Sequence, residues 1–169
     1  MTGKKLFFFL FIPLFLIIVV FSFYRYQEVN RPYRNYQIVE KTEKIGRPFS
    51  HQEVAYIFQT PEVRSRDDYD LYVIPLVIEN RSGQTVSFPI ESFILLADHF
   101  QTQVDLEQFQ SEPINREAGQ GIPPDGKKEF RLTFTLDKED PSRDRVELYF
   151  LRYDGGKMYK HKLDLSGPH

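Results

Sequence analysis

Four histidines and no cysteine make up the chain's supply of soft metal ligands and strong nucleophiles. His51, His99, His161 and His169 share no spacing that a metal site or a catalytic pair requires. The sequence also lacks a nucleophile elbow, a phosphate-binding glycine loop and a zinc-protease helix motif. We therefore predict no enzymatic activity, no cofactor and no metal.

Two acidic clusters, each before an expected strand, could supply oxygen ligands to calcium. The first contains Asp67, Asp68 and Asp70, and the second lies within residues 137–144. Both clusters also contain arginine or lysine residues, which would neutralise the acids and repel a cation. Aspartate is in addition a common turn residue. Cation binding is thus the less favoured interpretation.

Tyrosines near the C-terminus could form a binding surface. If Val146, Leu148 and Phe150 point into a core, Tyr149 and Tyr153 must point the other way, because side chains alternate along a strand. A tyrosine stripe suits a sugar or a protein partner, since the ring is apolar and its tip polar. Cross-strand packing under a loop is the alternative. The absence of tryptophan counts against sugar binding.

Strands must position these side chains, because the apolar residues repeat with period two. Residues 129–136, EFRLTFTL, alternate cleanly, and residues 145–165 read as a hairpin that turns at Asp154-Gly155-Gly156. Residues 71–78 are apolar on both faces, which predicts a central strand with a bulge or an unpaired edge at Pro75. Further strands are expected at 36–41, 53–60, 86–90 and 92–98. About eight short strands predict an all-β fold, an antiparallel β-sandwich over residues 36–169.

One segment interrupts this pattern. Between two expected strands lies His99–Lys128, far longer than a connection in a compact domain requires. Leu106, Phe109 and Ile114 give this insertion apolar anchors, and Asp105 is placed to cap a short helix. We predict that the insertion is a recognition region with these three candidate interaction residues. The alternative is that it only covers an edge of the sandwich.

The N-terminus predicts a membrane anchor. Leu6–Phe23 is 18 residues without a charge, about 27 Å as a helix, which is close to the roughly 30 Å hydrocarbon core of a bilayer. It is longer than the apolar core of a signal peptide, and no cleavage site follows it. We expect one transmembrane helix in residues 1–24, with residues 6–23 in the lipid bilayer, and a stalk at 25–35. Because a short basic tail precedes the helix, the N-terminus is expected in the cytoplasm and the C-terminal domain outside the cell.

Several turn and core residues carry a resemblance to a known type of domain. Asn80 and Ser82 follow one strand, Phe93 and Leu95 lie in another, and the Pro124–Gly126 turn leads to a strand with Phe130 and Phe134. This order resembles the immunoglobulin-like extracellular domains of unknown function from Gram-positive bacteria, of the lipoprotein or anchored surface type. The likeness covers roughly residues 50–165. It implies an immunoglobulin-like sandwich, and it supplies no catalytic motif.

Charge excludes one class of partner. Beyond Lys4 and Lys5 the chain has 20 basic and 24 acidic residues in mixed order, so no basic surface for nucleic acid is expected. We therefore predict a single-pass, membrane-anchored, extracytoplasmic interaction or accessory domain of the cell envelope, whose partner is an unknown envelope protein. The alternative is an extracytoplasmic domain that binds a small ligand, a sugar or a cation.

Overall fold

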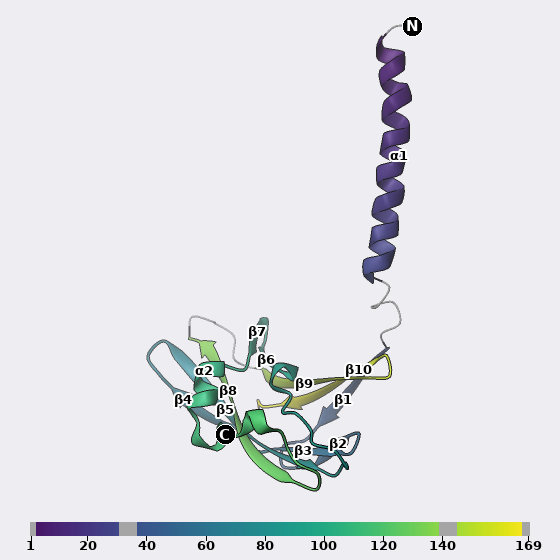
Figure 1. Cartoon of the computed structure of the whole chain (residues 1–169). Helices are drawn as coiled ribbons and strands as arrows, with labels where there is room; N and C mark the ends of the chain where they lie inside the picture. The colour runs from purple at the N-terminus through teal and green to yellow at the C-terminus, as the bar shows by residue number, and fades with distance from the viewer. Residues whose placement is uncertain (1–2, 31–36, 139–144, 167–169) are drawn as a thin grey trace. The chain divides into compact units, whose positions relative to one another are not determined.

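The computed structural model describes residues 3–30, 37–138 and 145–166 (Figure 1). The chain divides into two compact units between Gln37 and Ile38. The first unit contains one helix, α1 (Gly3–Asn30), which includes residues 3–24 of the predicted anchor and residues 25–30 of the predicted stalk. Among the described residues, no helix combines the length and the hydropathy that a membrane crossing needs. The structure therefore does not support the transmembrane part of the prediction.

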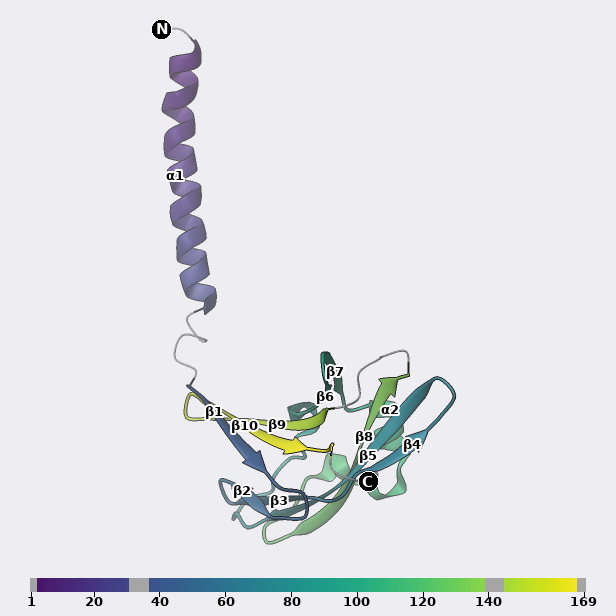
Figure 2. The ribbon, with the colours of Figure 1, turned by 180° about the vertical axis from the view of Figure 1, so that it is seen from behind.

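The second unit is a sandwich of two sheets, which confirms the predicted all-β class. Sheet A has the order β1-β10-β9-β6-β7, and Figure 2 shows β1 beside β10 at one edge. Its strands are β1 (Gln37–Glu43), β6 (Phe93–Ala97), β7 (Phe100–Gln103), β9 (Val146–Asp154) and β10 (Lys157–Asp164). The β9–β10 hairpin turns at Gly155 and Gly156, with φ of 53° and 78°. This confirms the predicted turn, since glycine adopts positive φ without a steric penalty.

Sheet B is organised around its longest strand. β5 (Tyr69–Asn80) pairs antiparallel with three other strands of the sheet. These are β3 (Val54–Phe58), β4 (Glu62–Ser65) and β8 (Lys127–Asp137), and β2 (Phe49–His51) adds to β3. β8 lies along one side of β5, whereas β3 and β4 share the other side, one after the other along its length.

Pro75 lies at the junction between β3 and β4. Pairing with β3 ends at Leu76, and pairing with β4 begins at Val73. The Pro75 carbonyl accepts a hydrogen bond from the Gln59 backbone at 2.9 Å. The Pro75 nitrogen, which carries no hydrogen, therefore faces the break between β3 and β4, where no hydrogen bond between strands is lost. The predicted unpaired edge at Pro75 is confirmed.

The core lies between the two sheets and is rich in aromatic rings. Phe130, Leu132, Phe134 and Leu136 of β8 all point into it, as their alternation predicts. From sheet A, Phe93 and Phe150 stack with ring centroids 4.8 Å apart. Residues 71–78 of β5 contribute apolar side chains on both faces, and all but Pro75 are buried.

Some expected strands differ from those observed. Residues 86–90 form no regular strand: Val86 makes an isolated bridge to Ile122, and a 3-10 turn, η1 (Ile90–Ser92), follows Pro89. Proline at that position fixes φ and removes a donor, which ends the extended run. The short strands β2, β4 and β7 were not expected. Each has only three or four residues, too few for a period-two pattern to be distinguished.

Candidate functional site

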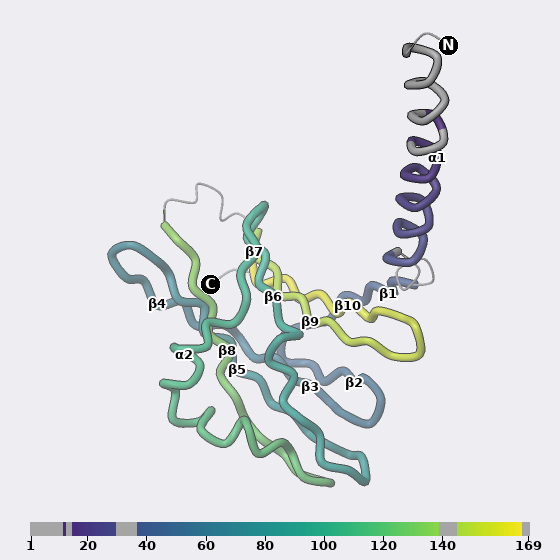
Figure 3. Tube along the Cα trace, turned by 45° about the horizontal axis from the view of Figure 1, so that its top comes forward, coloured from purple at the N-terminus to yellow at the C-terminus, as the bar shows by residue number. Residues whose placement is uncertain are grey.

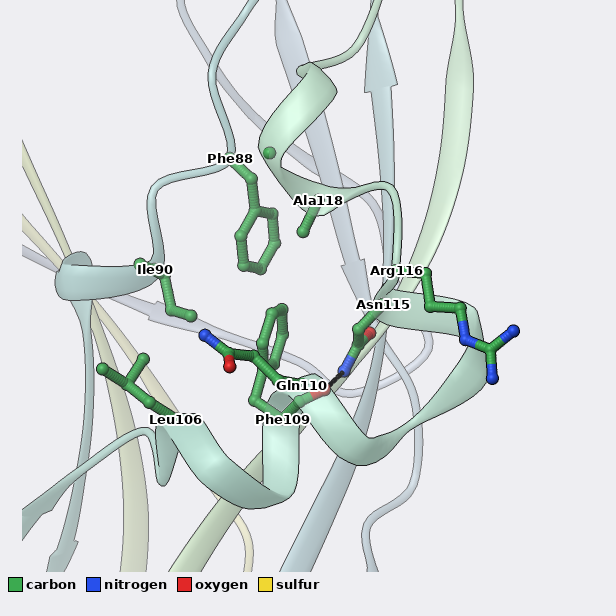
Figure 4. A pocket seen from close by; sticks show the side chains of 9 residues that line it. Phe88, Ile90, Leu106, Phe109, Gln110, Asn115, Arg116 and Ala118 are labelled. Carbon is green, nitrogen blue, oxygen red and sulfur yellow. Dashed lines mark hydrogen bonds between the residues drawn. The ribbon is translucent and has the colours of Figure 1, made fainter.

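A pocket of about 540 Å³ lies between the insertion and the segment that precedes β6 (Figure 4). The rings of Phe88 and Phe109 form an aromatic pair within it, with centroids 5.4 Å apart and planes 16° from parallel. Phe88 also contacts Phe130 of β8, 4.2 Å between centroids, which ties the pocket to the core. The other lining residues are Ile90, Leu106, Gln110, Asn115, Arg116, Ala118 and Gly119.

The insertion builds most of the pocket from short helices. α2 (Leu106–Ser111) is followed by the 3-10 turns η2 (Pro113–Asn115) and η3 (Ala118–Gln120). Asp105 caps α2, since its Oδ1 accepts from the Gln108 N–H at 3.1 Å, as predicted. Its other oxygen accepts from the Thr135 hydroxyl at 2.7 Å, so the same side chain also ties the helix to β8. Figure 3 shows α2 beside β8.

Backbone bonds attach the insertion to the outer edge of β8. The Asp105 N–H donates to the Thr133 carbonyl at 2.8 Å. Arg131 lies two residues before Thr133 on the same strand. The Asn115 side chain donates to the Arg131 carbonyl at 2.8 Å and accepts from the Arg131 N–H at 2.9 Å. Asn115 is 3% exposed and also donates to the Phe109 carbonyl. The insertion therefore covers an edge of sheet B, and it lines a pocket at the same time.

Ion pairs hold the outer side of the insertion. Glu112 accepts from Arg64 of β4 at 3.1 Å and from Arg131 of β8 at 3.4 Å. Arg64 also bonds Glu62, and its hydrogen bonds to Glu62 and Glu112 raise the pKa of the guanidinium. Because these side chains are partly exposed, each pair contributes at most about 1 kcal/mol. Their effect is to fix the position of η2 over the sheet.

Asn80 holds the exit of the insertion from the opposite side. Its fully buried amide donates to the carbonyls of Gln84, Ile122 and Pro123 at 2.7–3.0 Å. Its carbonyl oxygen accepts from the hydroxyl and the N–H of Ser82. Asn80 and Ser82 are thus structural elements of the turn that follows β5.

The three candidate residues of the insertion have different roles. Phe109 is 3% exposed and part of the core, whereas Leu106 is 55% exposed at the lip of the pocket. Ile114 is 42% exposed and does not line the pocket. The structure thus brings Leu106 and Phe109 together and leaves Ile114 outside. Phe88, Ile90 and Asn115 were missed, because their sequence context signals a strand or a loop and only the fold brings them together.

Tyr149 and Tyr153 belong to β9 in sheet A and do not line the pocket. Tyr149 is 9% exposed: its hydroxyl donates to Glu147 at 2.6 Å, and the Lys160 ammonium lies 4.2 Å from its ring centroid. Burial, together with the bond to Glu147, raises the pKa of this phenol. Tyr153 is 63% exposed near the hairpin turn. The two tyrosines therefore do not form one continuous open surface.

The acidic clusters give no metal geometry in the part of the chain that is described. Residues 3–30, 37–138 and 145–166 contain no group of three potential metal ligands. In the first cluster, Asp70 is 6% exposed and accepts from the Ser65 hydroxyl at 2.5 Å. Most of the second cluster, residues 139–144, lies outside the described residues.

The pocket has three polar lining side chains, those of Gln110, Asn115 and Arg116. Among its lining residues Arg116 is the one charged side chain, and Figure 4 shows it extending away from the aromatic pair. The amide of Asn115 is used by backbone groups. The pocket thus combines apolar side chains with a few polar groups, a composition that small-molecule binding sites and active sites share.

The sequence matches no known family profile and no curated protein. Solved structures share its fold. An uncharacterised β-sandwich protein from Clostridium difficile is 14% identical, with a TM-score of 0.50, over 73% of this chain and 95% of that chain. The yjhA protein from Bacillus subtilis is 14% identical, with a TM-score of 0.52, over 72% and 99%. The secreted protein MPT63 from Mycobacterium tuberculosis is 11% identical, with a TM-score of 0.51, over 75% and 98%. The domain therefore has the β-sandwich fold of uncharacterised proteins from Gram-positive bacteria.

Proposed function

We propose that this chain is a membrane-anchored, extracytoplasmic accessory domain of the immunoglobulin-like type, which binds another protein of the cell envelope. The pocket under the insertion is the binding site in this proposal. The observation that carries it is Leu106, a leucine that is 55% exposed beside the pair of the buried Phe109 and the half-buried Phe88. An apolar side chain at the lip of an apolar pocket is a favourable anchor point for a partner, because its burial releases water.

The anchor in this proposal rests on the sequence of α1. Leu6–Phe23 contains no charged residue, and Tyr24, Arg25 and Tyr26 follow it, residue types that are enriched at membrane interfaces. An outward orientation agrees with the fold shared with MPT63, which is described as a secreted protein. The interaction role agrees with the absence of a nucleophile or of a titratable pair among the residues that line the pocket.

Site-specific photocrosslinking in native membranes tests this function. A benzophenone amino acid replaces Leu106 in the full-length chain, and in a matched second variant it replaces Tyr153, which is 63% exposed on sheet A. We expect a discrete crosslinked protein from position 106 and none from position 153. The additional substitution Ala118→Arg, on the opposite wall of the pocket, should abolish the crosslink from position 106. Crosslinking from position 153 alone would assign recognition to sheet A, and none from either position would refute the proposal.

A further inference from the structure

Two buried imidazoles meet where β2 of sheet B faces β10 of sheet A. His51 is 6% exposed and His161 is 1% exposed. Their ring centroids lie 5.9 Å apart with the planes nearly perpendicular, at 87°. The Nε2 atoms of both rings are buried and have no hydrogen-bond partner in the protein. An unpartnered polar atom at such depth is uncommon and requires a physical explanation.

Glu43 sets the tautomer of His161. Its Oε1 lies 2.9 Å from His161 Nδ1, and a carboxylate can only accept, so Nδ1 carries the proton. In the neutral ring, Nε2 then has no hydrogen, and its lone pair faces the protein interior. Phe49 stacks on this ring with centroids 4.7 Å apart. Neutral His161 therefore packs like an aromatic core residue.

A second proton on either ring would be unfavourable. Burial lowers the pKa of both imidazoles, and the cations Arg152 and Lys41 lower it further. The bond to Glu43 acts in the opposite direction on His161, but burial outweighs it. Among the described residues, the charged groups that act on the pair are Lys41 and Glu43 from β1 and Arg152 and Asp154 from β9, and the titratable ring of Tyr159 from β10 contacts His51. Arg152 Nε is a third buried atom without a partner.

These residues attach an edge strand to the sandwich. β1 is mostly exposed and has β10 as its neighbour in sheet A. Its side-chain attachments are Glu43 to His161, Glu40 to Lys160 at 3.4 Å, and the Lys41 ammonium 5.5 Å from the Tyr159 ring. On the other side of the pair, β2 is a three-residue strand that contains His51. Both strands are thus held at the point where the imidazoles meet.

We propose that Glu43, His51, His161 and Arg152 form an acid-sensitive latch, which holds β1 and β2 on the sandwich while both imidazoles are neutral and releases them when they are protonated. Protonation puts an N–H group without an acceptor into the interior and places two imidazolium charges beside Arg152. Opening this corner of the sandwich returns both rings to water. None of the latch residues lines the pocket, so the latch is independent of the proposed binding function.

The expected pH window follows from the direction of the shifts. Because both pKa values are lowered in the folded state, the latch is fully closed above the ordinary histidine pKa of about 6.5 and is lost as the pH falls toward the folded values. Each unit of lowering corresponds to about a tenfold increase in the opening equilibrium at low pH. Below this window the domain would lose β1 and β2, one from each sheet, before its other strands open.

Hydrogen–deuterium exchange on the full-length protein in detergent micelles tests the latch. Exchange is compared at about pH 7.5 and pH 5, the range in which histidine titrates, after correction for the intrinsic pH dependence. We expect amide exchange in residues 37–51 to become faster at pH 5 relative to exchange in β5. The expected factor is about tenfold for each unit by which folding lowers a histidine pKa. The His51→Phe/His161→Phe variant keeps the aromatic volume and should lose this response. His99→Phe, at an exposed position, should retain it.

Equal acceleration in β5 would mean global unfolding and would overturn the latch, as would a wild-type response in the double variant. If the double variant does not fold, His51→Phe alone keeps the Glu43–His161 bond and should lose part of the response; keeping all of it would refute the proposal. Imidazole NMR titration of the unmodified protein gives a separate test. Both buried rings should titrate below about 6.5, and values at or above that contradict the latch.

Discussion

The side-chain amide of Asn115 forms a reciprocal pair of hydrogen bonds with the backbone of Arg131. Asn115 Nδ2 donates to the Arg131 carbonyl at 2.8 Å, and Asn115 Oδ1 accepts from the Arg131 N–H at 2.9 Å. One side chain thus makes the contacts that a neighbouring strand would make along this edge. Because α2 and η2 are fixed in this way, the pocket has a defined shape and does not depend on loop conformation alone.

Replacing Asn115 by alanine should strongly destabilise the domain. The substitution leaves the carbonyls of Phe109 and Arg131 and the Arg131 N–H without their partner, at a cost of about 2–4 kcal/mol in the free energy of unfolding. Gln110→Ala, at the exposed rim, is the control and should change it by less than about 0.5 kcal/mol. Urea denaturation measures both. Equal stabilities would show that the insertion is not attached through Asn115.

Leu106 and Phe109 should separate binding from stability. Phe109→Ala removes a buried ring and should cost about 3–5 kcal/mol. Leu106→Ala, at a position that is 55% exposed, should change stability by less than about 1 kcal/mol and yet abolish capture of the partner. Thermal melts are compared for the two variants, and crosslinking yields are measured with the benzophenone amino acid at the exposed lining position Gln110. Unchanged crosslinking in a stable Leu106→Ala protein would show that the insertion only covers the edge of sheet B and does not bind the partner.

The anchor should keep the protein in membranes with its domain outside. Protease added to intact, wall-stripped cells should degrade residues 38–169, and the full-length chain should sediment with the membranes. Ile17→Arg places a charge within the apolar run, at about 2.5–3.5 kcal/mol for insertion, and should release a larger soluble fraction. Thr2→Arg, before the run, is the control. Full protection from protease would show that the domain lies inside the cell. A mature protein that starts near Phe23 and is found in the medium would show that the segment is a cleaved signal and not an anchor.

A fragment that starts near Asn30 should fold alone. Every residue of the core cluster lies in the unit Ile38–His169, so removal of α1 leaves the core complete. The far-ultraviolet circular dichroism spectrum should be that of a β protein, with one cooperative melting transition. A helical spectrum or the absence of a transition would contradict the division into two units.

Calcium should have no effect on this fragment. Saturation at 100 times the dissociation constant would add about 2.7 kcal/mol, which raises the melting temperature of a domain of this size by several degrees. We expect a shift of no more than about one degree on adding calcium or a chelator. Differential scanning calorimetry measures it, with magnesium as the control cation. A large rise specific to calcium would restore the cation-binding alternative.

Period-two patterns predicted the long strands well. In β8, four apolar residues alternate with Arg131, Thr133 and Thr135, and one face of the strand is buried against the core. The β9–β10 turn followed from two consecutive glycines. At both places the local sequence alone determines the conformation, so no knowledge of distant contacts was needed.

The pocket could only be predicted in part. Apolar residues in the insertion indicated a packed segment, but a helix of six residues has no reliable periodicity, so nothing showed that Phe109 would be buried and Leu106 exposed. Phe88 comes from a segment that was expected to be a strand. Tyr149 bonds Glu147 of its own strand, but it is also covered by Lys160 of β10, and this contact between strands depends on a register that the alternation cannot reveal.

The position of β5 at the centre of sheet B has a consequence for the order of folding. β3, β4 and β5 are close in sequence and can pair early, whereas β8 must return across the 46 residues between Asn80 and Lys127. The insertion hydrogen-bonds to the backbone of β8, so it has no docking edge until that long-range pairing is complete. A nascent chain therefore exposes Phe88 and Phe109 until β8 has paired with β5, and until then this aromatic pair is an apolar point of contact for a folding factor.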